Sequence, residues 1–400
     1  MKTRISLITL MLLSPLVFSE EKQSDVIVVG GGIVGASIAY HLSKDGLNVT
    51  VLEREKPASH ASRGTFAWLN ASWAKQPFAY HQLNQQSVSY WHELSVQLDI
   101  PVKWGGSLEW FSSQKRSATL VSQIEEQARW DEPARIISTK QAEEIEPNVS
   151  FPSGSVIAFS ENDGALDPQL ATHKLLDAAK KLGTNVLYPC KVISLEIESS
   201  QAVVTEECGK FSAKKIVLAV GANSTFIKAT TGLTIPQRST PGVIAVTKPL
   251  PNLIDRIIVA PGVHIHQRLD GRIVIGEQAG APDNAQHKER LARRPNSYPN
   301  NQFANQHFQQ LLALATVVIP EIASAEMESM YIGWRPLPLD GHPVLGYTND
   351  DNDVYIAIMH SGVTLAPIVG KLVALEIQNQ IQDQLAPYRP NRDFDLIQRY

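Results

Sequence analysis

The chain has 400 residues, of which 43% are hydrophobic and 19% are charged. Because a single hydrophobic core stops growing at roughly 250–300 residues, this length predicts two subdomains. The net charge of −4, from 36 basic and 40 acidic residues, excludes an electrostatic basis for binding nucleic acid.

The N-terminal residues are typical of an export signal. Two basic residues precede an apolar run from Ile5 to Phe18. This run is shorter than the ~20 residues that cross a bilayer, which favours a cleaved signal peptide over residues 1–19 and a periplasmic or secreted protein. The alternatives are an uncleaved inner-membrane anchor and a start codon placed too early.

A dinucleotide-binding pattern follows the signal. Residues 25–29, DVIVV, predict a buried parallel strand, and glycines occupy the G-x-G-x-x-G positions Gly30, Gly32 and Gly35. A helical pattern and a second strand ending in Glu53 complete the unit. This order of strand, glycine turn, helix and second strand predicts that a diphosphate binds at the helix N-terminus and that a ribose donates hydrogen bonds to Glu53. The acid favours FAD or NAD over NADP, and the motif alone does not separate FAD from NAD.

The next segment, PASHASRGTFAWLNAS, is rich in small and hydroxyl side chains. Ser59, Ser62 and Gly64 either lie against the diphosphate and ring of a cofactor or form an ordinary serine-rich loop. Further along, Trp104 and Trp110 either wall a pocket or, as we favour, pack in the core.

The chain has only two cysteines, Cys190 and Cys208. An oxidising compartment would allow them to form a disulfide. Two separate structural thiols are the favoured interpretation.

Two histidines alternate along the strand pattern GVHIHQR, so His264 and His266 face the same side. No Cys, Asp or Glu nearby completes a metal site, and none is predicted. The histidines either line a pocket or form a polar strand face. The polar stretch 281–303 is expected to be a loop or lid.

A second strand-to-helix turn lies near the C-terminus. Residues 354–359 predict a buried strand, and the sequence HSGVTLAPIVG turns into a helix through Ala366 to Glu376, with Pro367 in its first turn. Two helix N-termini so far apart in the chain suit one extended cofactor, with phosphates on the first and a reactive ring on the second.

These motifs resemble the FAD-dependent amine and amino-acid oxidoreductases of the D-amino-acid oxidase type, which include glycine oxidase, sarcosine oxidase and D-amino-acid dehydrogenases. The matching stretches are the glycine turn with Glu53, SHASRG, IVLAVGANS, GVHIHQRLDGRIVIGE, GWRPLPLDGHPVLG and HSGVTLAPIVG. The resemblance runs from about residue 24 to residue 385. It is specific for the family and not for the substrate.

The resemblance implies an α/β fold, α+β overall, in which a Rossmann-like FAD-binding domain is interleaved with an antiparallel-sheet substrate domain. The FAD-binding domain would comprise residues 24–95, 155–235 and 330–385, the substrate domain residues 96–154 and 236–329, and the tail residues 386–400. The implied FAD contacts are Gly30, Gly32, Ile33, Val34, Gly35, Glu53, Arg54, Ser62, Arg63, Gly64, Val192, Ala219, Gly221, Gly362, Val363, Thr364 and Leu365.

For the substrate, the family resemblance points to Arg335 in the G-x-R-P motif, which would pair with a carboxylate. A guanidinium suits this role because it binds a planar carboxylate in a bidentate manner and keeps its charge. A structural ion pair is the alternative role of this arginine. His264 and His266 are the other candidate catalytic residues, since one face of their strand looks at the flavin in the family.

Three departures from the family bear on the cofactor. Val274 stands where sarcosine oxidases carry an oxygen-activating lysine. No cysteine lies near Gly333 to bind the flavin covalently, and Ala61 stands where related dehydrogenases carry a histidine. We therefore expect non-covalent FAD.

The resemblance implies oxidation of the α-amino C–H bond of an amino acid or N-substituted amino acid, with hydride transfer to flavin N5 and hydrolysis of the imine. The electron acceptor is oxygen or a quinone-type carrier, and the latter would bring peripheral membrane association. The missing lysine favours the carrier. The alternatives are a non-catalytic flavin-binding electron-transfer or accessory subunit, oxidation of a secondary amine without a carboxylate, and an NAD-dependent dehydrogenase.

Overall fold

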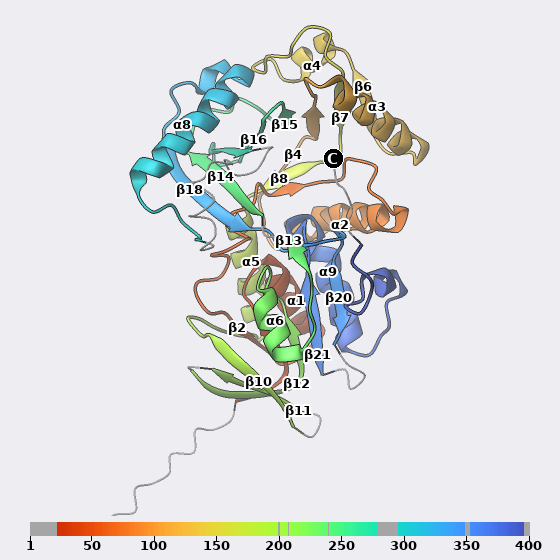
Figure 1. Ribbon diagram of the computed structural model, residues 1–400, viewed down its shortest axis with the longest axis vertical. Coiled ribbons are helices and arrows are strands. Elements are labelled where there is room, and N and C mark those ends of the chain that lie inside the picture. Colours follow the sequence, from red (N-terminus) through yellow and green to blue (C-terminus); the bar gives the residue numbers. More distant parts are fainter. Residues whose placement is uncertain are drawn as a thin grey trace, which may run out of the picture.

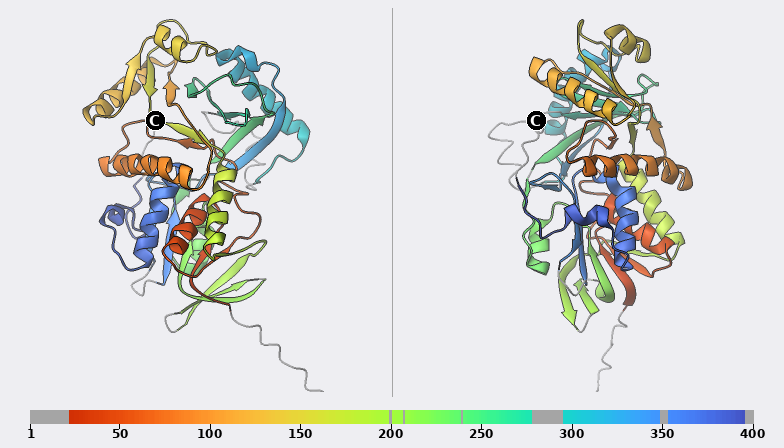
Figure 2. Two further views of the ribbon diagram at one scale, coloured as in Figure 1. Left: turned by 180° about the vertical axis from the view of Figure 1, so that it is seen from behind. Right: turned by 90° about the vertical axis from the view of Figure 1, so that its right-hand side faces the viewer.

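The computed structural model describes residues 22–198, 201–206, 208–238, 240–277, 295–348 and 353–395. Two large sheets lie one above the other, and α2 (Phe78–Gln97) lies where the two halves meet (Figures 1 and 2). The predicted fold class, an α/β cofactor domain with an antiparallel-sheet partner, is confirmed. The predicted export signal lies outside the described residues.

The first sheet has eight strands and is built on the predicted nucleotide-binding unit. β1 pairs in parallel with β2 and β12, β2 pairs in parallel with β9, and β12 pairs in parallel with β21. The antiparallel strands β10, β11 and β20 complete it. The bounds are β1 (Lys22–Val29), β2 (Val49–Leu52), β9 (Asn185–Leu187), β10 (Val192–Glu198), β11 (Gln201–Glu206), β12 (Gly209–Leu218), β20 (Val344–Tyr347) and β21 (Val354–Ile358).

Helices cover this sheet and pack on it through broad faces of apolar side chains. Ile33, Ile38 and Leu42 of α1 are buried, and together with α9 and α5 they form the largest hydrophobic cluster. The helices of this half are α1 (Ile33–Lys44), α5 (Pro168–Lys181), α6 (Ser224–Thr231), α9 (Gly362–Ile377) and the 3-10 helix η2 (Asp383–Tyr388).

Pro367 lies inside α9 rather than in its first turn, because the helix already begins at Gly362. A proline lacks the N–H group that would bond to the carbonyl four residues earlier, here that of Val363. Trp91 of α2 donates its indole N–H to this carbonyl over 2.9 Å. The tryptophan thus replaces the missing helical hydrogen bond and ties α2 to the start of α9.

The second sheet also has eight strands, in the order β18-β14-β17-β16-β15-β5-β7-β6, and its pairings are antiparallel apart from β15 with β5. One face packs on α8 through residues such as Ile258, Ile265 and Ile275. The bounds are β5 (Ser107–Glu109), β6 (Ala134–Ile137), β7 (Ile157–Ser160), β14 (Pro241–Thr247), β15 (Ile257–Ala260), β16 (Val263–Gln267), β17 (Ile273–Glu277), β18 (Met327–Trp334), α3 (Gln114–Arg129), α4 (Thr139–Ile145), α8 (Asn301–Val318) and the 3-10 helix η1 (Pro320–Ile322).

Small sheets connect the halves. β3 (Trp68–Leu69), β8 (Gly164–Leu166) and β4 (Val102–Trp104) form one, and β13 (Gln237–Arg238) with β19 (Leu337–Pro338) forms the other. β7 falls within the sequence-assigned cofactor segment 155–235, yet it pairs with β5 and β6 in the second sheet. The expected loop or lid lies largely outside the described residues, and α8 begins at Asn301.

The described part of the C-terminal tail packs back on α9. Arg389 donates to the buried carboxylate of Glu376 over 2.8 and 2.5 Å, and Arg392 donates to Asp340 over 2.7 Å. No helix among the described residues is both long and apolar enough to cross a membrane.

Candidate active site between the two sheets

The glycine turn after β1 has the close backbone contacts that the motif predicts. Gly30 adopts φ +113°, and a Cβ on Gly35 would lie 2.1 Å from the Gly30 carbonyl oxygen. Gly32 caps α1 without a side-chain acceptor. The amide of Ile33 donates to Ser62 Oγ over 3.0 Å. The amides of Val34 and Gly35 meet no acceptor within the described chain, so this helix start offers donors to a phosphate.

Glu53 lies beside this turn at the end of β2. Its carboxylate accepts hydrogen bonds from the amides of Gly31, over 2.7 Å, and Glu55, over 2.9 Å. Its carbonyl oxygen accepts from the amide of Cys190 over 2.7 Å. The structure therefore brings the predicted ribose acceptor against the predicted diphosphate turn. Its neighbour Arg54 is exposed and contacts His60, away from the turn.

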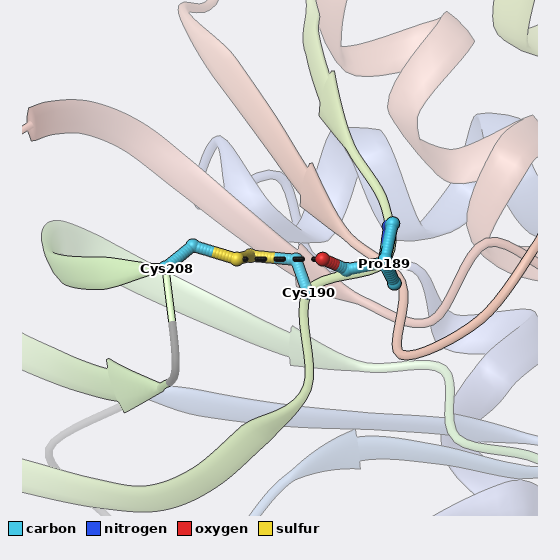
Figure 3. The surroundings of a disulfide bond; sticks show 3 residues. All are labelled: Pro189, Cys190 and Cys208. Atoms are coloured by element: carbon cyan, nitrogen blue, oxygen red, sulfur yellow. Dashed lines mark hydrogen bonds between the residues drawn. A yellow bond between two sulfur atoms is a disulfide. The ribbon is translucent and has the colours of Figure 1, made fainter.

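Cys190 and Cys208 form a disulfide, with their Cα atoms 5.9 Å apart (Figure 3). The expectation of two separate thiols is therefore wrong. The error has a physical reason: pairing of β10, β11 and β12 brings residues distant in sequence to one end of the sheet. Val192, the predicted adenine contact, is buried two residues beyond Cys190.

The SHASRG segment crosses from the first sheet to the second. A Cβ on Gly64 would lie 2.4 Å from Gly333 Cα, so only glycines allow this contact between the segment and β18. The guanidinium of Arg63 lies 4.9 Å from the centroid of the Tyr331 ring. Its Nε atom and Ser59 Oγ are buried without a hydrogen-bond partner in the described part of the chain.

Two other predicted cofactor residues lie at the far end of β12. The Ala219 amide donates to Val29 over 2.9 Å, and its carbonyl oxygen would lie 2.5 Å from a Cβ on Gly30. Gly221 follows with φ +59°. Ala219 thus lies along the side of the glycine turn.

The second helix start, at α9, lies beside the first. A Cβ on Gly362 would lie 3.2 Å from Val34 Cγ2. The amides of Gly362, Val363 and Thr364 meet no acceptor among the described residues. Leu365 differs from expectation, because its amide already donates to Ser361 within the helix over 3.0 Å.

These features fit FAD. Two helix N-termini with unused N–H groups lie side by side, buried polar atoms lack partners between them, and glycines leave room that a Cβ would fill. Gly30 to Gly35 with Glu53 would hold the adenosine and diphosphate. The start of α9 would stabilise negative charge on a reduced ring.

The substrate face of the second sheet is the side that looks toward the cofactor residues. Across its strands, directly paired residues form one row of six positions: Glu109, Val259, His264, Gly276, Ile244 and Tyr331. Phe66, next to the SHASRG segment, packs on this row against Gly276 and edge-on to His264. The row therefore lies at the junction of the two halves.

Arg335 follows β18 directly, and its side chain passes over Gly242, where a Cβ would lie 3.3 Å from the arginine Nε. Burial lowers the pKa of its guanidinium. In the described part of the chain, no carboxylate pairs with this group and no acceptor binds its nitrogens. The alternative role as a structural ion pair has no support in these residues. A half-buried cation without a carboxylate partner among the described residues suits an anionic ligand.

The two histidines share a face, as predicted, but differ in their surroundings. His266 is buried, and its Nε2 bonds to the carbonyl oxygen of Phe66 over 2.8 Å, so its ring is held in place. His264 is half-buried, and neither of its ring nitrogens makes a hydrogen bond to a described residue. Burial, then the charges of Arg335 and Arg116, lower the pKa of His264 to about 4. The imidazole is therefore neutral at pH 7 and available to a ligand.

The sequence did not point to three residues of this face: Trp68, Trp73 and Glu109. Trp110, by contrast, is buried in the core, and Trp104 stacks on His92, which agrees with the favoured packing role. The signal for the first two was the pair of tryptophans that follows the SHASRG segment within ten residues. No group of three or more metal-binding side chains occurs among the described residues.

Comparisons with known proteins agree with this geometry. The family model described as "FAD dependent oxidoreductase" (DAO) matches residues 25–375. Glycine oxidase of Geobacillus kaustophilus is 26% identical over 93% of this chain and 98% of its own length. The 4-methylaminobutanoate oxidase (formaldehyde-forming) of Paenarthrobacter nicotinovorans is 24% identical over 87% of this chain and 43% of its own length. The crystal structure of glycine oxidase from Geobacillus kaustophilus superposes with a TM-score of 0.83, at 24% identity, over 94% of this chain and 100% of that one.

Proposed function

The chain belongs to the DAO family of FAD-dependent oxidoreductases that act on C–N bonds, and from this membership we propose that it oxidises an amino acid or N-substituted amino acid whose carboxylate binds Arg335. The observation that carries the proposal is the half-buried guanidinium of Arg335, which lies over Gly242 beside the SHASRG segment without an acidic partner in the described chain. A substrate carboxylate supplies that partner. An amine without a carboxylate would leave the charge unpaired.

The residues around Arg335 favour the reactive form of the substrate. The positive charge of the guanidinium disfavours a protonated amine nearby, so the amine binds as the free base. A free amine has the lone pair that assists loss of hydride from the adjacent carbon. Phe66 and Trp68 close the face above His264 and exclude water.

FAD, held without a covalent link, would supply the redox chemistry, a two-electron oxidation of the substrate amine to an imine, and the imine would hydrolyse in water to an oxo acid and ammonia or an amine. The protein contributes orientation of the substrate carbon and electrostatic stabilisation at the start of α9. The electron acceptor is oxygen or, as the valine at position 274 favours, a quinone-type carrier at the membrane surface.

The test is anaerobic reduction of the bound flavin. The purified holoprotein, mixed without oxygen with D-amino acids, L-amino acids and N-methyl amino acids, should lose its yellow absorbance with at least one of them. Subsequent addition of air or of a soluble quinone identifies the acceptor by the faster return of colour. A flavin that no amino acid reduces would contradict the proposal and favour an electron-transfer or accessory role.

We also propose that the protein works outside the cytoplasm. The support is the leader-like N-terminus together with the Cys190–Cys208 disulfide, which an oxidising compartment preserves. We expect the full chain, expressed in a bacterium, to appear in the periplasm with cleavage after Ser19 and no free thiols. Reduction should lower the free energy of unfolding by about 3 kcal/mol, given a sequence separation of 18 residues. Cytoplasmic recovery with an intact N-terminus and two reactive thiols would contradict this.

A further inference from the structure

Glu109 lies on the substrate face of the second sheet, although it is far from Arg335 in the chain. In the strand register, Glu109 pairs with Val259, and Val259 pairs with His264. Side chains directly opposite one another on paired strands share a face. Glu109 and His264 therefore point the same way, toward the cofactor residues, while the adjacent Leu108 points into the core under α8.

Only one of the two carboxyl oxygens of Glu109 accepts a hydrogen bond from a described residue. The residue is 4% exposed, and its Oε2 accepts a hydrogen bond from Trp73 Nε1 over 2.6 Å. Its Oε1 accepts no hydrogen bond from any residue that the structure describes. The Trp73 ring packs edge-on to Trp68, with centroids 5.1 Å apart, and Trp68 packs on His264. Aromatic rings thus connect the glutamate to the histidine along one wall.

Among the residues that the structure describes, no buried cation pairs with Glu109. Burial raises the pKa of Glu109 to about 7, and the carboxylate of Asp163 also raises it, against the hydrogen bond from Trp73 and the charge of Arg116. Asp163, the nearest acid, is itself fully engaged by the amides of Ala71 and Ser72 and the hydroxyl of Ser107. Arg116 is an exposed residue of α3. A cationic group of a ligand would therefore pair with the Glu109 carboxylate.

The order of these groups along the substrate face sets the distance between His264 and Glu109. Arg116 acts on both His264 and Glu109, whereas Arg335 acts on His264 and is not among the charges that act on Glu109. At a strand spacing of about 4.8 Å, the two strand steps from His264 to Glu109 span about 10 Å. An amino acid with its carboxylate on Arg335 and its amine near His264 leaves Glu109 beyond the α-carbon.

We propose that Glu109 binds the distal cation of the substrate, which is therefore a basic amino acid or an N-substituted amino acid that ends in an amine or guanidine. This inference rests on the proposed function, because it takes the carboxylate to be held by Arg335. Glycine, sarcosine and alanine are too short to reach Glu109. The glutamate is a specificity-determining residue and not a source of redox chemistry.

The experiment compares flavin reduction by short and long substrates. The short set is glycine, sarcosine and both enantiomers of alanine; the long set is both enantiomers of ornithine, lysine and arginine. In the wild-type holoprotein, kcat/KM for the best long substrate should exceed that for the best short one at least tenfold. Glu109→Gln should lower this ratio at least tenfold, mainly through KM. Glu328→Gln, a control at an exposed acid of β18 that pairs with Arg272, should leave the ratio unchanged.

The pH dependence gives a second readout. An ionised carboxylate binds a cation better than a neutral carboxyl does, so KM for long substrates should fall as the pH rises through about 7. Glu109→Gln should remove this step. Trp73→Phe removes a hydrogen bond that lowers the pKa of Glu109 and should move the step to higher pH. A merely structural glutamate would show neither change.

The outcomes separate the inference from the proposed function. Reduction by short amino acids alone, or an equal effect of Glu109→Gln on both sets, would overturn the role of Glu109 and leave the proposed function standing. Absence of reduction by every amino acid would overturn both.

Discussion

Replacement of Arg335 by leucine should raise KM for the carboxylate-bearing substrate by roughly two to three orders of magnitude. The substrate carboxylate would enter a buried site without a counter-charge, and the loss of one partner of a buried charge pair costs about 2–5 kcal/mol. The flavin spectrum should not change, since the guanidinium binds no other described residue. The measurement is the rate of anaerobic flavin reduction against substrate concentration.

Two further variants sharpen this result. Arg335→Lys keeps the charge but loses the planar fork, so its KM should lie between those of the wild type and the leucine variant. Arg272→Leu removes an arginine of the same sheet whose partners are surface carboxylates, and it should leave the kinetics unchanged. Equal KM values for wild type and Arg335→Leu would remove the arginine from substrate binding.

Replacement of Gly35 by alanine should abolish FAD binding. The new Cβ would lie 2.1 Å from the carbonyl oxygen of Gly30, and because this oxygen belongs to the backbone, the start of α1 has to move away from the turn. We expect flavin occupancy below about a tenth of the wild-type value and a loss of at least ~3 kcal/mol of stability. The measurements are the flavin absorbance per mole of purified protein and the unfolding curve.

The control for this variant is Gly154→Ala. Gly154 also has positive φ, +75°, but nothing lies within 4 Å of its Cβ position. The backbone strain should cost about 1–2 kcal/mol while the protein keeps its full flavin content. Full flavin content in Gly35→Ala would show that the turn tolerates a side chain and would contradict the packing argument.

The cofactor half of the site was predictable because its signals are local. Each glycine of the turn, the acid after β2 and the start of α9 is defined by neighbours within a few residues of sequence. The alternating strand pattern GVHIHQR, residues 262–268, likewise matches β16 (Val263–Gln267). Local backbone requirements are what a single sequence carries most directly.

Glu109 and the disulfide were not predictable, for a different reason. β5 has only three residues, too few to show an alternating pattern, so the direction of Glu109 follows only from its pairing with β15. Likewise, the approach of Cys190 to Cys208 follows from how β10, β11 and β12 pair. Both features depend on register between segments distant in sequence, which no periodicity within one segment reveals.

The hydrogen bond from Cys190 to the main chain of Glu53 ties the disulfide to the adenosine end of the site. Binding equilibria that share such a structural element are reciprocal. If the oxidised chain binds FAD more tightly than the reduced chain, bound FAD stabilises the disulfide against reduction by the same factor. Cofactor binding and disulfide formation at this end of the sheet are therefore coupled by one shared factor, which a comparison of FAD affinity in the oxidised and reduced chains measures.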